Sequence, residues 1–329
     1  MKKKFKAFIS YQNQNGYFEN KITLKSFNEL PNADLLIKVK YSSLNYKDAL
    51  SATGSKGVTK HYPHTPGIDA AGIIVKSKNS YFKPNDRVIV TGFDLGMNTS
   101  GGFAEYIQVP SSWVIKCPDS LPLKEAMMIG TAGLTAGLCV HEIENHTKIK
   151  NLKVIVSGAT GGVGSIAVML LSYLGAKVTS ITGKENTDSY LLDLGSSEII
   201  NRDHFVNSTR LPLNRGNYDA AVDVVGGNIL SSIIASMTYN GIITVCGNVA
   251  NPKFSTSVFP FILRKNRLIG IDSASNPIND RKEIWNKFSS SWRLNNLNQS
   301  VKIINLDSLD REIKKILCGE QIGRVVVQL

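Results

Sequence analysis

A glycine-rich stretch between two apolar runs is the first part of the sequence that could do chemistry. Val154–Val156 has the composition of a buried strand, and residues 157–164 then read SGATGGVG. Apolar residues recur at helical spacing from Ile166 onward. A strand, a glycine loop and a helix in this order are the setting in which helix amides bind the pyrophosphate of a dinucleotide. We therefore predict a phosphate cradle here.

The glycines of this loop have separable roles. Gly161 would let the backbone approach a pyrophosphate, and Gly164 would let the helix pack close to the strand. Ala159 stands where G-x-G-x-x-G has its first glycine, so the literal motif is broken, and a glycine-rich packing turn is the alternative. A P-loop needs a lysine before its last hydroxyl residue, and Gly164-Ser165 has none, which disfavours a nucleoside triphosphatase.

The end of the next predicted strand bears on which dinucleotide is bound. NAD-binding proteins place an acid there, about 20 residues after the glycines, to hold the ribose hydroxyls. Here Thr182-Gly183-Lys184 occupies that place. A hydroxyl, a glycine and a cation suit a 2′-phosphate, and Arg202 could add a second cation. The pattern therefore favours NADP(H) over NAD. The alternative is that Lys184 is only a solvated lysine in a loop.

Short strands and helices alternate from Leu152 onward. The alternation predicts a parallel, doubly wound α/β sheet. A longer helical pattern precedes it, from Glu125 to about Ile143. We expect strands at 154–156, 177–181, 199–200, 220–225, 242–246 and 268–271, and helices at 162–174, 186–194 and 228–237.

The first 120 or so residues have a different character. Short runs rich in Val, Ile and Tyr alternate with turn residues, which predicts a compact barrel-like or sandwiched β module. At the other end of the chain, a helix and a last strand at Arg324–Gln328 have no crossover to join, so we expect that strand to return to the β module. The chain of 329 residues favours two domains.

Composition limits the partners. The net charge of +12 is typical of proteins that bind nucleic acid, anionic membranes or anionic ligands. The basic residues are, however, spread along the chain without a run of five. No stretch approaches the roughly 18 apolar residues of a membrane span. Lys6, the last residue of the basic start MKKKFK, breaks the apolar stretch, and SYQNQNGYFEN (10–20) ends it, which disfavours a signal peptide. We predict a cytoplasmic enzyme with no nucleic-acid or membrane partner.

Cysteine and histidine spacing argues against a metal. The four cysteines lie far apart with no C-x-x-C pair, so buried free thiols are expected, and the five histidines show no H-E-x-x-H pairing. We therefore predict no metal site.

Seven motifs occur in one order over nearly the whole chain. They are SSLNYKDAL (42–50), PGIDAAG (66–72), GGFAEY (101–106), IGTAGLTA (129–136), SGATGGVGS (157–165), DVVGG (223–227) and PFILRKNRLIGIDS (260–273). In these motifs the sequence resembles the medium-chain dehydrogenase/reductase superfamily, in its zinc-free quinone oxidoreductase branch and the YhdH/YhfP group. The resemblance implies a GroES-like β domain of residues 1–124 and 275–329, a Rossmann NADP(H)-binding domain of residues 125–274, and a homodimer with its active-site cleft between the domains.

Zinc alcohol dehydrogenases of this superfamily carry a Cys ligand, a Gly-His-Glu motif and a four-Cys lobe. The matching regions here read Asn45-Tyr46-Lys47-Asp48 and Gly67-Ile68-Asp69, and no such lobe lies between Gly92 and Cys117. Without a Lewis acid to hold an alkoxide, alcohol oxidation is a poor fit. Reduction of a polarised C=C bond needs hydride at the β-carbon, a proton at the α-carbon, and donors for the charge that builds on the carbonyl oxygen.

Two neighbouring residues are the catalytic candidates. The Tyr46 phenol could donate a hydrogen bond to the substrate carbonyl or pass a proton. The equal alternative is that Tyr46 only packs on the cofactor. Asn45 is a second donor candidate, and Asp69 is expected to order its loop rather than act as an acid. Arg264 and Lys265 are candidates for contact with CoA phosphates or a dimer partner, a solvated basic face being the alternative.

The resemblance also implies cofactor contacts. Asn248 departs from the apolar residue expected at its position, which affects the nicotinamide pocket only if the side chain is used. Tyr46 is expected to lie near the nicotinamide. The remaining positions are Ala159, Thr160, Gly161, Gly162, Val163, Thr182, Gly183, Lys184, Arg202, Asn248, Ile262 and Ser273.

The leading functional interpretation is NADPH-dependent reduction of a short α,β-unsaturated acyl-CoA, specifically of acryloyl-CoA to propionyl-CoA. The first alternative is an NADPH-dependent quinone or enone oxidoreductase of broad specificity. A non-enzymatic NADPH-binding protein on the same fold is the third interpretation; loss of the Tyr46 region would favour it, and that region is intact.

Overall fold

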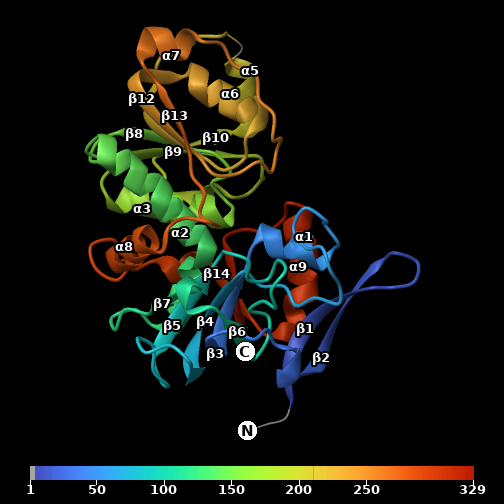
Figure 1. Ribbon diagram of the computed structural model, residues 1–329. Coiled ribbons are helices and arrows are strands. Elements are labelled where there is room, and N and C mark those ends of the chain that lie inside the picture. Colours follow the sequence, from blue (N-terminus) through green and yellow to red (C-terminus); the bar gives the residue numbers. More distant parts are fainter. Residues whose placement is uncertain (1–3, 210) are drawn as a thin grey trace. The chain divides into compact units, whose positions relative to one another are not determined.

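The computed structural model describes residues 4–209 and 211–329 and divides into two compact units (Figure 1). The first three residues of the basic start lie outside the described residues. The first unit comprises Met1–Thr131, Ala274–Ser289 and Val301–Leu329, and the second comprises Ala132–Ser273 and Ser290–Ser300.

The first unit is built on a seven-stranded sheet of order β14-β15-β3-β4-β5-β7, with β6 also paired to β3. Strand β15 runs antiparallel to β3, which confirms that the last strand of the chain returns to the β module. One face of the sheet buries aliphatic side chains such as Ile37 and Val88. The strands are β3 (Leu35–Leu44), β4 (Asp69–Ser77), β5 (Arg87–Thr91), β6 (Tyr106–Val109), β7 (Val114–Lys116), β14 (Val301–Ile304) and β15 (Arg324–Gln328).

Two helices and a hairpin complete the apolar packing of this unit. Helix α1 (Tyr46–Ala52) packs with α9 (Leu309–Leu317), and Ala49 and Leu309 share one buried cluster. The hairpin of β1 (Lys4–Gln12) and β2 (Phe18–Ser26) was not expected from the sequence. It projects as a two-stranded ribbon in Figure 1. Helix α8 (Ile278–Phe288) also belongs to this unit.

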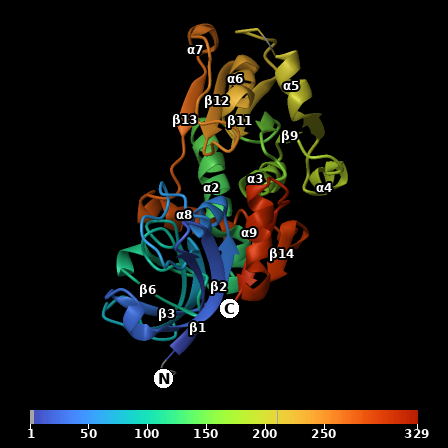
Figure 2. The ribbon, with the colours of Figure 1, turned by 90° about the vertical axis from the view of Figure 1, so that its right-hand side faces the viewer.

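The second unit contains the predicted parallel sheet, in the order β10-β9-β8-β11-β12-β13. This is the doubly wound order in which ligands bind outside the carboxyl ends of the strands. The strands are β8 (Lys153–Val156), β9 (Lys177–Thr182), β10 (Glu198–Asn201), β11 (Tyr218–Asp223), β12 (Met237–Val245) and β13 (Arg267–Gly270). The helices, seen around the sheet in Figure 2, are α3 (Gly162–Tyr173), α4 (Asp188–Asp193), α5 (Arg202–Ser208), α6 (Gly227–Ala235) and α7 (Phe259–Arg264).

Several expected boundaries in this unit were wrong. Strand β11 ends at Asp223 rather than at residue 225, because the Asp223 carboxylate accepts the Gly226 N–H at 2.8 Å and turns the chain. Met237, expected to end a helix, begins β12 because α6 already stops at Ala235. Helices α5 and α7 were not expected.

Helix α2 (Leu123–His146) corrects one further expectation. By length and composition it could cross a membrane, although the sequence appeared to hold no stretch of that kind. Of its most apolar window, 83% is buried within the protein. Because a core helix passes the same test, we interpret α2 as a core helix. It breaks at Gly130, whose φ of 53° and ψ of −159° are not helical.

The four cysteines are free thiols. Cys117 and Cys139 are buried as expected, whereas Cys246 is partly buried and Cys318 is exposed.

Candidate cofactor and catalytic sites

The glycine loop of the second unit has the geometry of a phosphate cradle. Gly158 follows the end of β8 with a φ of +56°, and Gly161 is the N-cap of α3. Because Gly161 has no side chain, no side-chain oxygen from that position caps the first amides of α3. Unsatisfied amides and the positive end of the helix dipole attract an anionic group.

The same geometry explains the broken motif. The left-handed turn falls on Gly158, so Ala159 keeps an ordinary backbone, and its buried N–H donates to the Ile181 carbonyl at 3.2 Å. A Cβ on Gly164 would overlap the Gly158 carbonyl and lie 2.8 Å from Ala159 Cα. A Cβ on Gly161 would lie 3.3 Å from its nearest neighbour, the Gly158 oxygen. Gly164 is therefore the position with no space for a side chain.

A buried pair fixes this loop to the neighbouring one. Ser157 Oγ donates to Asp223 Oδ1 at 2.7 Å and accepts the Val224 N–H at 3.0 Å. Burial raises the pKa of Asp223, while hydrogen bonds to its carboxylate from Ser157 and from the Gly226 and Val225 amides act in the opposite direction. Sequence reasoning did not identify this pair, although the DVVGG motif was a signal for it.

The predicted 2′-phosphate residues converge. Thr182 Oγ1 accepts the Lys184 N–H at 3.1 Å, which shapes the loop after β9. Gly183 lies against Arg202, because a Cβ at this position would be 2.8 Å from the guanidinium carbon. Arg202 Nε also lies 3.3 Å from Asp203 Oδ1. Burial lowers the pKa of Lys184. The loop and Arg202 thus form one small basic region at the carboxyl ends of β9 and β10.

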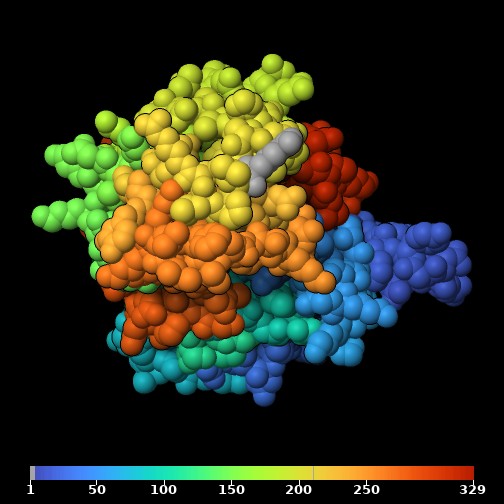
Figure 3. Space-filling view, turned by 90° about the horizontal axis from the view of Figure 1, so that it is seen from above, coloured from blue at the N-terminus to red at the C-terminus, as the bar shows by residue number. Residues whose placement is uncertain are grey.

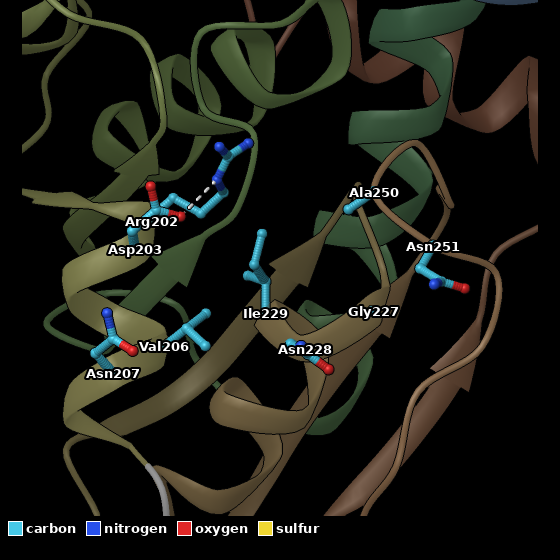
Figure 4. A pocket seen from close by; sticks show the side chains of 9 residues that line it. All are labelled: Arg202, Asp203, Val206, Asn207, Gly227, Asn228, Ile229, Ala250 and Asn251. Carbon is cyan, nitrogen blue, oxygen red and sulfur yellow. Dashed lines mark hydrogen bonds and ion pairs between the residues drawn. The ribbon is translucent and has the colours of Figure 1, made fainter.

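A pocket of about 520 Å³ opens beside Arg202. Figure 4 shows side chains of α5 facing those at the start of α6, with a loop after β12 along the third side. Most of the residues that line the pocket are polar or have small side chains. The lining residues are Arg202, Asp203, Val206, Asn207, Gly227, Asn228, Ile229, Ala250 and Asn251.

The other predicted cofactor positions lie elsewhere in the second unit. Asn248 is in the loop after β12, and Ile262 is 69% exposed on α7. Ser273 Oγ accepts a hydrogen bond from Thr135 Oγ1 at 2.6 Å. Thr160, Gly162 and Val163 follow the loop into the first turn of α3.

Arg264 has an internal role. Its guanidinium donates to the carbonyls of Met237 at 2.7 Å, Ala235 at 3.1 Å and Asn214. These bonds tie α7 to the end of α6 and the start of β12. The structure thus gives Arg264 a role within the fold, and its contact with CoA phosphates or a dimer partner stays a prediction.

In the first unit, the two catalytic candidates stand at the start of α1. Asn45 is the N-cap and is nearly buried, whereas Tyr46 is 37% exposed. The Asn45 N–H donates to Asp48 Oδ2 at 2.8 Å, and the Ile68 N–H donates to Asp48 Oδ1 at 2.7 Å. Asp48 therefore joins the first turn of α1 to the segment that leads into β4.

Asp69 is the centre of a buried polar network. Its Oδ2 accepts hydrogen bonds from Ser43 Oγ at 2.5 Å and from Asn45 Nδ2 at 2.8 Å. The Thr131 N–H and hydroxyl donate to the same carboxylate, and Arg324 Nη2 lies 3.7 Å from Oδ2. Asp69 thus orders its surroundings, as the sequence indicated. The buried polar network comprises Ser43, Asn45, Asp48, Asp69, Thr131 and Arg324.

The charges of this network are unbalanced. Burial, and secondly the Asp69 carboxylate, raise the pKa of Asp48 to about 7. Burial lowers the pKa of Arg324, which the two carboxylates oppose. One buried cation therefore accompanies two carboxyl groups, of which Asp48 holds a proton below neutral pH.

Asn45, Asp48 and Asp69 of this network lie in the two segments that the resemblance matches to the zinc-ligand regions. Among residues 4–209 and 211–329, no group of three or more His, Cys, Asp and Glu side chains is arranged to hold a metal ion.

Comparison with known proteins identifies relatives for both parts of the chain. A family model described as alcohol dehydrogenase GroES-like domain matches residues 31–119, and one described as zinc-binding dehydrogenase matches residues 162–290. Acrylyl-CoA reductase AcuI of Ruegeria pomeroyi is 33% identical over 98% of both chains. YhfP of Bacillus subtilis, a quinone oxidoreductase by name, is 40% identical over 92% of this chain and 93% of its own.

Two crystal structures of such relatives contain a dinucleotide. The YhfP structure, which has NAD bound, matches with a TM-score of 0.96 at 38% identity and covers 100% of both chains. The yhdH oxidoreductase of Salmonella enterica, in complex with NADP, matches with a TM-score of 0.94 at 36% identity and covers 98% of this chain and 99% of that one.

Proposed function

The chain belongs to the medium-chain dehydrogenase/reductase superfamily, in its YhdH/YhfP quinone oxidoreductase group, and from this premise we propose that it reduces the C=C bond of a short α,β-unsaturated acyl-CoA with NADPH. The proposed substrate is acryloyl-CoA, with propionyl-CoA as product. The full-length likeness to an acrylyl-CoA reductase is the observation that carries this choice.

The cofactor is NADPH. When bound, its nicotinamide supplies the hydride that the reaction requires. The amides at the start of α3 would hold the pyrophosphate, and Lys184 with Arg202 would pair the 2′-phosphate. Two observations support this assignment: Gly183 lies against the Arg202 guanidinium, and the Thr182–Lys184 loop itself carries no acid. A relative with NADP bound supports this choice, and the NAD complex of YhfP makes it a point to test.

The first unit would supply the proton-handling group. Tyr46 is partly exposed at the first position of α1, so its hydroxyl can reach a ligand while its backbone stays anchored. A phenol there can donate to the carbonyl oxygen on which charge develops, or pass a proton to the α-carbon. Residues 1–124 with 275–329 would thus form the catalytic domain, and residues 125–274 the cofactor domain.

We also propose a homodimer that works in the cytoplasm. Strand β13 ends the six-stranded sheet, so one of its edges is open to pair with a second strand. Exposed apolar side chains flank it on the segment coloured orange in Figure 3. They are Val249, Phe254, Val258, Phe259, Ile262 and Leu263. Free thiols at all four cysteines suit a reducing compartment.

A quinone or enone oxidoreductase is the second candidate, favoured by the name of the 40%-identical relative YhfP. The test compares NADPH oxidation with acryloyl-CoA, crotonyl-CoA and a soluble quinone. We expect kcat/KM to be highest for acryloyl-CoA, and a preference for the quinone would refute the acyl-CoA assignment. Tyr46→Phe should lower kcat by about 10²-fold or more if the hydroxyl takes part in proton transfer. Unchanged turnover would leave Tyr46 with packing alone.

A further inference from the structure

We propose that Arg324 is a positioning residue for the reaction, because it fixes the Asn45 side chain and thereby the start of α1 from which Tyr46 projects. This inference rests on the proposed function only in assigning the reaction to Tyr46. The contacts that support it lie entirely within the first unit.

The guanidinium reaches the end of β3 and the start of α1. Arg324 Nη1 donates to Asn45 Oδ1 at 3.1 Å and to the Leu44 carbonyl at 3.2 Å. Nη2 donates to Ser43 Oγ at 2.8 Å, and that hydroxyl in turn donates to Asp69. A planar fork that serves three consecutive residues holds the turn between β3 and α1 in one geometry.

The Asn45 amide is fully committed to this network. Its Nδ2 donates to Asp69 Oδ2 at 2.8 Å, with the Ser43 carbonyl at 3.2 Å and Asp48 Oδ2 at 3.3 Å also within reach. Turning the amide over would set its NH₂ against the guanidinium and its oxygen against the Asp69 carboxylate. One orientation is therefore enforced. In this proposal Asn45 acts by holding α1, and not as a direct donor to the substrate.

The break in α2 makes room for the network. A Cβ at Gly130 would lie 2.5 Å from Ser43 Oγ and 2.6 Å from both Arg324 Nη2 and Asp69 Oδ2. The non-helical backbone at this glycine also leaves the Met128 carbonyl to accept from Arg324 Nε at 3.3 Å. The IGTAGLTA motif is thus explained by the network, which needs a glycine at this position.

The test uses Arg324→Lys, Asn45→Ala and the double variant in the full-length protein. Lysine keeps the positive charge beside Asp69 but cannot reproduce the fork. We expect Arg324→Lys to lower kcat at least tenfold while KM for NADPH changes less than twofold. Because both residues act through one contact, the double variant should lose less than a further twofold relative to Asn45→Ala. If the fold-losses in kcat of the two single variants multiply in the double variant, the proposal is overturned.

A second measurement does not depend on the substrate. Hydrogen exchange of the amides of residues 46–52 should accelerate at least fivefold in Arg324→Lys. The matched control is Arg281→Lys, because Arg281 is equally buried but donates to the carbonyls of Thr91, Ala274 and Asn276. That control should leave α1 exchange unchanged. Unaltered α1 exchange in Arg324→Lys, or equal acceleration in the control, would refute the positioning role.

The two proposals fail differently. If the wild-type protein reduces none of the three acceptors with NADPH, the proposed function fails, and the exchange data alone decide whether Arg324 fixes α1. If acceptors are reduced but Arg324→Lys retains wild-type kcat, the positioning role fails and the proposed function stands.

Discussion

Arg324 donates to Asn45 Oδ1 at 3.1 Å although the two residues are 279 positions apart in the sequence. Strand β15 brings the C-terminal arginine alongside β3, and α1 begins directly after β3. The last strand of the chain therefore contributes to the start of the helix that carries Tyr46. This relationship gives the return of the chain to the first unit a functional reason in addition to completing a sheet.

Replacement of Asp69 by Asn should destabilise the protein strongly. The change removes the carboxylate that lies 3.7 Å from the buried Arg324 and replaces an acceptor by an NH₂ group that faces other donors. Breaking a buried pair in this way costs about 3–5 kcal/mol in the free energy of unfolding. Urea denaturation measures it. Glu19→Gln, at the exposed pair with Lys21, should leave the urea midpoint unchanged. A shift for Asp69→Asn as small as that control would contradict a buried ion pair.

Asp48 should make stability depend on pH in a defined window. Its pKa rises from an ordinary 3.8 to about 7 in the folded protein. Between about pH 4 and pH 7 the folded state therefore holds one more proton than the unfolded state, so the contribution of Asp48 to stability falls as pH rises through this window. Above about pH 7 that contribution is constant.

Asp48→Asn removes this titration. The variant should lose about 1–3 kcal/mol at pH 5 because one acceptor of the Asn45 and Ile68 amides is replaced by a donor. Its deficit relative to the wild type should then shrink by about 2 kcal/mol between pH 5 and pH 7. Urea unfolding at several pH values measures the difference. Parallel stability curves would show that Asp48 is ionised throughout.

The two glycines of the cofactor loop should behave differently when changed to alanine. Gly164→Ala forces a Cβ into the Gly158 carbonyl and should cost about 1–3 kcal/mol of stability. Gly161→Ala meets nothing closer than 3.3 Å and should fold normally, yet its methyl group would stand at the α3 N-terminus where the pyrophosphate is expected. Thermal unfolding and NADPH titration separate the two effects. Equal losses of stability in the two variants would show that Gly164 is no more crowded than Gly161.

Much of the fold could be predicted because its signals are local. The strand Val154–Val156, the glycine loop and the apolar helix face from Ile166 each show their period within a few residues. The missed elements also had local signals. Asn201 caps α5 by accepting the Asp203 and His204 amides, and the Asn15-Gly16 pair lies in the turn of the first hairpin.

The buried polar network could not be predicted in this way. Ser43, Asp69, Thr131 and Arg324 come from four separate segments, and only the paired strands and the broken helix bring them together. No period or spacing in the sequence connects Arg324 to Asn45. Sequence reasoning therefore found Asn45 through its motif, as a second donor candidate, but could not find its partners Asp69 and Arg324, because they are distant in the chain.

Preference for NADPH should depend on Lys184 and Arg202. Loss of one charge-assisted contact to the 2′-phosphate costs about 1.5–3 kcal/mol, so Lys184→Ala and Arg202→Ala should each raise KM for NADPH about 10-fold to 100-fold. KM for NADH should stay within twofold, because NADH has no phosphate at that position. Lys177→Ala, at the opposite end of β9, is the matched control and should change neither value. Steady-state kinetics with both cofactors measures this, and a parallel rise of KM for NADH would show that the two cations hold something other than the 2′-phosphate.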